Sequence, residues 1–168
     1  MIIEGRARLL GDHVNTDYII SSRRKRETIN EADLVPFLLE GIDPAFAASV
    51  REGDILVTGR NFGCGSAMEV AATVILAAGI RAVVAKSFAR SFYRNAINNG
   101  LLVAACDTAA IGNGERIRID LLGDSIRVIR VASGATVDGG ALPFIMAEIL
   151  AAGGLVGYLR ANGRFVAK

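Results

Sequence analysis

Two apolar runs, Ala82-Val83-Val84-Ala85 and Leu101-Leu102-Val103-Ala104, enclose residues 82–104, which read AVVAKSFARSFYRNAINNGLLVA. Each run is apolar throughout, which is typical of a parallel strand buried on both faces. Between them we expect a helix over about residues 87–98, ended by Gly100. Upstream, Ile55-Leu56-Val57 predicts another strand, and the Ala-rich residues 67–78 predict another helix. This β-α-β-α-β order predicts parallel pairing in the middle of the chain.

The flanking segments predict the remaining elements. Residues 1–10 predict a first strand, the charged residues 21–27 a loop, and residues 31–40 a short amphipathic helix. A hairpin is predicted by residues 117–121, in which apolar and charged residues alternate, by the turn Gly123-Asp124 and by the second strand at residues 125–131. Pro143 is expected to open a last helix that ends at Gly153-Gly154. We therefore expect an α/β fold, a single compact domain over residues 1–168 with a mixed sheet and flanking helices.

Composition excludes several classes of protein. The net charge of the 168 residues is only +2, which argues against a dedicated nucleic-acid binder. Two cysteines, Cys64 and Cys106, cannot form a disulfide framework or a four-cysteine cluster site, and one histidine does not favour a zinc site. The N-terminus lacks the apolar core of a signal peptide, and the longest mostly apolar stretch, residues 70–80, is too short for a membrane span. We expect a cytoplasmic protein with no metal of its own and with no nucleic-acid or membrane partner.

The turn Asn61-Phe62-Gly63-Cys64-Gly65-Ser66 leads from a predicted strand into the Ala-rich helix. Glycines let the backbone approach a ligand, and the N–H groups at a helix N-terminus favour an anion such as a carboxylate or phosphate. Ser66 would place its hydroxyl near that anion. Ser66 and Glu69 also have the spacing of a capping box, which explains both residues without any ligand.

Three segments together resemble a known family. They are residues 11–20 (GDHVNTDYII), residues 59–66 (GRNFGCGS) and residues 85–100 (AKSFARSFYRNAINNG), with residues 148–155 (EILAAGGL) as a fourth. In order and spacing they resemble the small subunits of 3-isopropylmalate dehydratases and the swivelling fourth domain of aconitases. The resemblance covers nearly the whole chain. It implies a swivelling β/β/α domain and a hydro-lyase subunit that is active only in a heterodimer with a large subunit.

The resemblance also implies a reaction and its residues. The enzyme would isomerise 2- and 3-isopropylmalate by dehydration and rehydration in leucine biosynthesis, a pathway of amino-acid biosynthesis. The family's large subunit carries a 4Fe-4S cluster whose open iron accepts the substrate hydroxyl, so this chain itself is expected to bind no cofactor. The small subunit supplies a serine alkoxide as base, which by position is Ser66. Thr16 and Asp17 match the family's active-site pair, and Gly65 belongs to the substrate-binding turn.

Two departures from the family concern the substrate, a small hydroxy-di- or tricarboxylic acid. Ala67 and Met68 stand where the family has a serine and an arginine that bind a carboxylate, so those roles do not carry over. Such a charge-assisted contact contributes about 1.5–3 kcal/mol. The loop after Ile20 is basic, Arg23-Arg24-Lys25-Arg26-Glu27, whereas an apolar tip suits the isopropyl group.

The basic tip leaves alternatives open. Arg23 and Arg26 would suit an additional carboxylate, as in homoaconitate or citrate-like acids. A solvated loop, or pairing with acidic residues of the large subunit, explains the same cations. A related hydro-lyase (homoaconitase, methylcitrate or dimethylmalate dehydratase) is therefore an alternative to the isopropylmalate enzyme. A second alternative is a non-catalytic regulatory subunit that has kept the fold.

Overall fold

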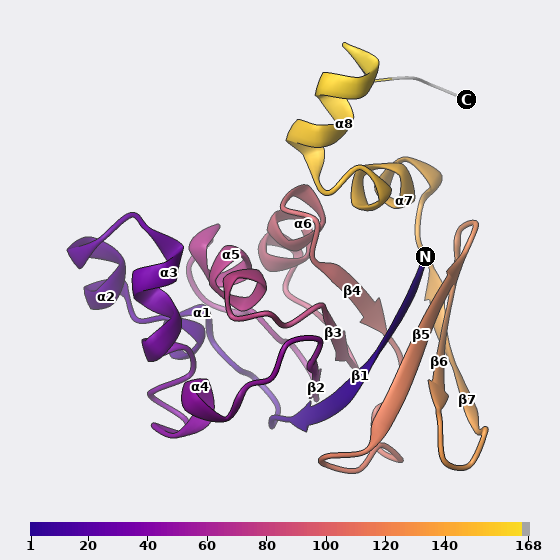
Figure 1. Ribbon diagram of the computed structural model, residues 1–168, viewed down its shortest axis with the longest axis horizontal. Coiled ribbons are helices and arrows are strands. Elements are labelled where there is room, and N and C mark those ends of the chain that lie inside the picture. The colour runs from indigo at the N-terminus through magenta and orange to yellow at the C-terminus, as the bar shows by residue number, and fades with distance from the viewer. Residues whose placement is uncertain (166–168) are drawn as a thin grey trace.

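A computed structural model describes residues 1–165, and its strands form one seven-stranded sheet in the order β4-β3-β2-β1-β5-β6-β7 (Figure 1). The strands are β1 (Ile2–Leu9), β2 (Ile55–Thr58), β3 (Ala82–Ala85), β4 (Leu102–Ala105), β5 (Arg116–Leu122), β6 (Ser125–Arg130) and β7 (Thr136–Ala141). The strands from β1 to β4 pair in parallel, whereas β1 with β5, β5 with β6 and β6 with β7 pair antiparallel. The α/β class, the mixed sheet, the parallel run and the hairpin are thus confirmed.

Strand β1 joins the two halves of the sheet. Residues Ala7–Leu9 pair with β2, and residues Ile2–Arg6 pair with β5. Gly5 pairs with β5 and lies two residues before the pairing with β2 begins, and a Cβ atom there would overlap the carbonyl oxygen of Gly53. The backbone of β1 therefore packs directly against the turn that precedes β2.

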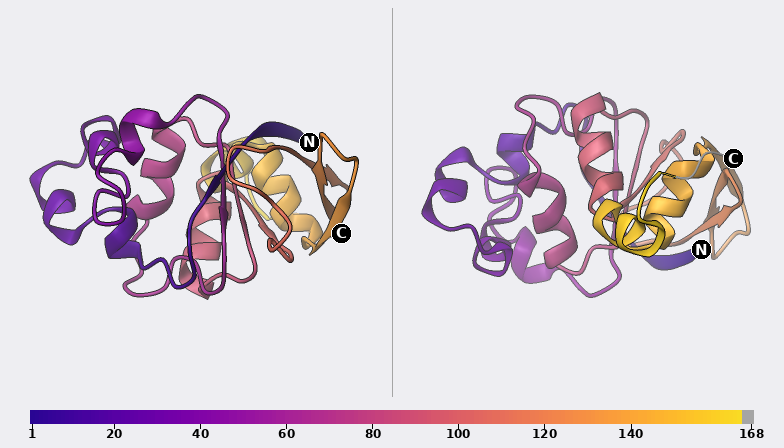
Figure 2. Two further views of the ribbon diagram at one scale, coloured as in Figure 1. Left: turned by 90° about the horizontal axis from the view of Figure 1, so that it is seen from below. Right: turned by 90° about the horizontal axis from the view of Figure 1, so that it is seen from above.

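The helices are α1 (Thr16–Ile19), α2 (Ser22–Glu27), α3 (Glu31–Leu34), the 3-10 helix η1 (Val35–Phe37), α4 (Phe46–Ser49), α5 (Val70–Ala77), α6 (Arg90–Asn98), α7 (Phe144–Ala151) and α8 (Leu155–Asn162). Helices α1–α4 gather at one end of the molecule, and β5–β7 lie at the other (Figures 1 and 2). Every residue of β2 and β3 is buried, as their apolar sequences predicted.

Most of the predicted loop over residues 21–27 is the helix α2, Ser22–Glu27. The helix α2 buries none of its residues, so it leaves no apolar period for sequence analysis to detect. Its N-cap is Ser21, whose Oγ accepts the backbone N–H of Arg24 at 3.3 Å. The predicted helix over residues 31–40 is also shorter, because Pro36 lacks the N–H that a continuing α-helix needs.

The C-terminal part contains two elements that the sequence did not predict. Strand β7 includes Gly139 and Gly140, which weaken a strand signal. Helix α7 begins after Pro143 and ends before Gly153-Gly154 as predicted, but these glycines, with φ of +76° and +116°, turn the chain into α8. Within residues 1–165 no single helix is long and apolar enough to cross a membrane, although the bent pair α7 and α8 would pass by length and composition alone.

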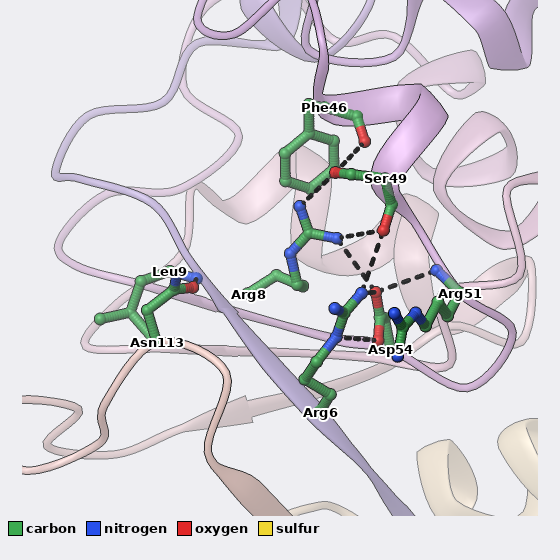
Figure 3. Close-up of polar contacts among 8 residues, drawn as sticks. All are labelled: Arg6, Arg8, Leu9, Phe46, Ser49, Arg51, Asp54 and Asn113. Atoms are coloured by element: carbon green, nitrogen blue, oxygen red, sulfur yellow. Dashed lines mark hydrogen bonds and ion pairs between the residues drawn. The ribbon is translucent and has the colours of Figure 1, made fainter.

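A buried carboxylate ties β1 to the segment before β2 (Figure 3). The side chain of Asp54 is only 2% exposed, and its oxygens accept hydrogen bonds from Arg6 at 3.0 and 2.7 Å and from Arg8 at 3.2 Å. The backbone N–H of Arg51 adds a further hydrogen bond at 3.1 Å. Arg8 also lies over the ring of Phe46, 4.5 Å from its centroid. One carboxylate therefore holds two arginines of β1 against the turn at Arg51.

Candidate active site

Residues 11–20, 59–66 and 85–100, the three segments that resemble the family, meet where β1, β2 and β3 end. The turn that follows β2 lies between the other two segments, bonded to both through its backbone. On one side, the N–H of Gly63 donates to Val14 at 2.8 Å; on the other, the N–H of Phe62 donates to Ser87 at 3.0 Å. Since the carboxyl ends of neighbouring parallel strands share one edge of a sheet, this meeting point is where α/β proteins bind ligands.

Thr16 fixes the backbone at Ser66. Its side chain is buried, its N–H donates to the carbonyl of Cys64 at 2.8 Å, and its hydroxyl donates to the carbonyl of Ser66 at 2.9 Å. Asn15 supports the same segment, because its Oδ1 accepts the N–H of Asp17 at 2.9 Å. Thr16 therefore holds the residue predicted to be the base, and does so through the main chain.

Ser66 is exposed, and its Oγ makes no hydrogen bond within residues 1–165. The predicted capping box is wrong. Helix α5 begins only at Val70, its N-cap is Glu69, and no side chain caps it. Glu69 instead accepts a hydrogen bond from Asn99 Nδ2 at 3.1 Å. Residues 66–69 precede the helix, and of these four only Met68 is buried, at 4% exposure.

The two glycines beside Cys64 are required by packing within the protein. Gly63 and Gly65 have φ of +75° and +94°. A Cβ atom on Gly63 would overlap Cβ and Cγ of the buried Phe92, and one on Gly65 would overlap the side-chain amide of Asn15. The glycines therefore bring the turn against α6 on one side and against the Asn15-Thr16-Asp17 segment on the other.

Replacing Gly63 by alanine is expected to destabilise the chain by about 2–3 kcal/mol, from the left-handed backbone and from overpacking against Phe92. Urea unfolding measures the loss. The matched control is Gly114→Ala, because Gly114 has a similar φ of +80° but no atom within 4 Å of a Cβ position. It should lose only the backbone part, about 1 kcal/mol. Equal losses in the two variants would contradict the packing role.

Asp17 connects the turn to the basic helix. Its Oδ1 accepts both the N–H of Ser22 at 3.1 Å and the hydroxyl of Ser22 at 2.5 Å. The same hydroxyl lies 3.9 Å from the sulfur of Met68. The N-terminus of α2 is thus held beside Met68, two residues after Ser66. The structure brings Thr16, Asp17, Gly65 and Ser66 into one neighbourhood.

The cations of α2 differ in their surroundings. Arg23 pairs with Glu27 at 3.4 Å, and both side chains are exposed. Arg24 pairs with Glu40 at 3.1 Å and lies over the ring of Phe37. Arg26 is exposed and has no ion pair within residues 1–165. Of the two predicted substrate-binding arginines, Arg26 is therefore the one whose charge is uncompensated.

Sequence analysis missed Asn15 and Ser22. Asn15 is the N-cap of α1 and had a detectable signal, because asparagine ahead of a helical turn is a preferred cap. Ser22 had none, since its partner Asp17 lies outside the helix that Ser22 begins.

The two cysteines lie in different surroundings. Cys64 is half-buried, with its sulfur 3.6 Å from the carbonyl oxygen of His13. Burial raises the pKa of the Cys106 thiol to about 11, and the negative charges of Asp107 and Asp138 add to this effect, so the thiol is neutral at physiological pH. Residues 1–165 contain no group of three His, Cys, Asp or Glu side chains that could hold a metal ion.

Comparison with known proteins gives consistent results. Residues 17–108 match the aconitase C-terminal domain family. The chain is 46% identical to a methanogen homoaconitase small subunit from Methanocaldococcus jannaschii, over 95% of this chain and 92% of that protein. It is 43% identical to a 3-isopropylmalate dehydratase small subunit from Methanopyrus kandleri, over 96% and 95%. A crystal structure of a 3-isopropylmalate dehydratase chain from M. jannaschii superimposes with a TM-score of 0.90, 45% identity and coverage of 97% and 96%.

Proposed function

The chain belongs to the aconitase C-terminal domain family, and from this membership we propose that it is the small subunit of a cytoplasmic, heteromeric hydro-lyase, with 3-isopropylmalate dehydratase as the first candidate. The observation that carries the proposal is the placement of Ser66. Its hydroxyl is exposed and unbonded within residues 1–165, while Thr16 holds its backbone. A side chain left free on a fixed backbone is suited to act on a substrate.

Ser66 is proposed to move one proton. As an alkoxide, its Oγ takes the proton from the carbon α to a substrate carboxylate. That electron pair forms the carbon–carbon double bond as the bond to the substrate hydroxyl breaks. Rehydration reverses the step, and the protonated Ser66 returns its proton to carbon.

The large subunit completes the proposed site. A 4Fe-4S cluster there would supply the Lewis acid that receives the hydroxyl. This chain has two cysteines, fewer than a cluster with three or four cysteine ligands needs, so the cluster is assigned to the partner.

Reconstitution tests the proposal. The chain is combined with its large subunit carrying an intact cluster, and isopropylmalate dehydration is followed through the unsaturated intermediate. We expect turnover by the complex and none by the isolated chain. An intact complex that turns over neither isopropylmalate nor any related hydroxy acid would refute the function.

A second candidate is a homoaconitase-type subunit. Arg26 favours it, because this exposed arginine on α2 has no ion pair within residues 1–165 and could bind an additional carboxylate. The homoaconitase small subunit among the relatives agrees with this candidate. A panel of isopropylmalate, homoaconitate, citrate, methylcitrate and dimethylmalate decides between the two.

On that second candidate, Arg26→Ala should lower kcat/KM for the tricarboxylate by about 10–100-fold, the loss of one charge-assisted contact. The value for isopropylmalate should change little. Lys25→Ala removes the same charge from the same helix and serves as the control. Turnover of isopropylmalate alone would remove the second candidate.

A further inference from the structure

The basic helix α2 needs support from outside itself. It has six residues, Ser22–Glu27, and buries none of them, whereas isolated helices shorter than about 12 residues are marginal in water. Yet the structure holds it as a helix beside the turn of Ser66. We propose that Arg24 and Glu40 form a clip that keeps α2 folded and oriented, and so act as positioning residues for substrate recognition by α2.

The geometry of Arg24 supports this role. Its Nε donates to Glu40 Oε1 at 3.1 Å and its Nη2 donates to Oε2 at 3.3 Å, the two-pronged arrangement in which arginine binds a carboxylate best. The guanidinium carbon lies 3.7 Å from the centroid of the Phe37 ring. Glu40 therefore holds the guanidinium group of Arg24 at its edge, and the Phe37 ring holds it on its face.

Glu40 and Phe37, the two partners of Arg24, are themselves connected to the site. The N–H of Glu40 donates to Phe37 at 3.1 Å, so that both partners of Arg24 belong to one turn. The next residue back, Leu39, is fully buried and donates its N–H to Ile19 of α1 at 2.9 Å. Through α1 the clip is connected to Thr16 and Asp17.

Asp17 supplies a second attachment at the start of the helix, through its two hydrogen bonds to Ser22. Held at Ser22 and at Arg24, the helix is constrained in both position and rotation. Lys25 and Arg26 are cations of α2 that take no part in the clip. Lys25 lines an open hollow of about 440 Å³ together with Glu31 and Glu69, and within residues 1–165 neither Lys25 nor Arg26 forms an ion pair.

Hydrogen exchange of the isolated full chain tests the clip without any need for activity. Arg24→Gln and Glu40→Gln should each raise amide exchange in residues 22–27 by about fivefold to tenfold, and the double variant should raise it no further. Lys25→Gln, which removes the same charge from the same helix, should leave that exchange unchanged. Unchanged exchange in Arg24→Gln, additive effects in the double variant, or a uniform rise over all elements would each overturn the clip.

The consequence for recognition rests on the proposed function and is measured in the reconstituted enzyme. There, Glu40→Gln should raise KM by about fivefold to tenfold with little change in kcat, because Ser66 keeps its own support while α2 loses its position. A fall in kcat with unchanged KM would overturn the positioning role. If exchange responds as expected but the wild-type complex has no turnover, the proposed function fails and the clip stands.

Discussion

Replacing Ser66 by alanine is expected to lower kcat of the reconstituted enzyme by about 10²–10⁴-fold, the usual contribution of a positioned base. Because Ser66 does not cap α5 and its Oγ makes no hydrogen bond within residues 1–165, the change should leave stability nearly untouched. From the sequence, Ser66 could be a helix cap and a base at once, whereas the structure leaves only the proposed role as base. A cap would cost about 0.5–2 kcal/mol of stability and little activity.

The measurement pairs kcat with urea unfolding of the isolated chain. Ser125→Ala is the matched control, since Ser125 is another exposed serine, at the start of β6 and away from the turn. It should change neither quantity. A Ser66→Ala complex that retains wild-type kcat with an intact cluster would instead support the non-catalytic, regulatory alternative.

Replacing Asp54 by asparagine is expected to destabilise the chain by about 3 kcal/mol, the lower end of the cost of breaking a buried ion pair. Asparagine keeps the shape but removes the charge, so Arg6 and Arg8 would face each other without their counter-charge (Figure 3). The lower end applies because Arg6 remains 30% exposed to solvent. Asp124→Asn, at an exposed turn, is the control and should have little effect.

The same carboxylate makes stability depend on pH. Burial alone would raise the pKa of Asp54, but hydrogen bonds from Arg6, from the N–H of Arg51 and from Arg8 outweigh it and hold the pKa below its ordinary value. A group with a lowered folded pKa stabilises the fold fully above its unfolded pKa, and this contribution is lost as pH falls through the folded value. The free energies of unfolding of the wild type and of Asp54→Asn should therefore begin to converge as the pH falls below about 4. A gap that stays constant to pH 2 would contradict the ion-pair origin.

The sequence predicted best where burial controlled the residue pattern. The strands β2, β3 and β4 are apolar runs, and both neighbouring helices end at a glycine with positive φ, Gly79 and Gly100. Prediction failed where structure depends on partners far along the chain. Helix α2 carries no apolar pattern and is held by Glu40, and α5 begins at Val70, after the side chain of Glu69 has bonded to Asn99 rather than to the helix.

The site shows the same division. That Thr16, Asp17, Gly65 and Ser66 belong to one site was expected from the family resemblance, and the structure shows that their segments follow the adjacent parallel strands β1 and β2. The cap assigned to Ser66 and Glu69 was wrong, since local spacing cannot show that Glu69 binds Asn99 instead. That Ser66 is the base remains a prediction, whereas its exposed and unbonded hydroxyl within residues 1–165 was visible only in the structure.

The position of β1 in the sheet determines the order in which its two edges can pair while the chain is being synthesised. Residues 2–6 leave the ribosome early, but their partners in β5 lie more than 100 residues later in the chain. Until β5 is made, β1 can pair only with β2, and its other edge is open to strands of neighbouring chains. A nascent chain halted after β4 would hold the proposed catalytic turn and all four parallel strands, yet the edge of β1 that pairs with β5 would be open and prone to aggregation.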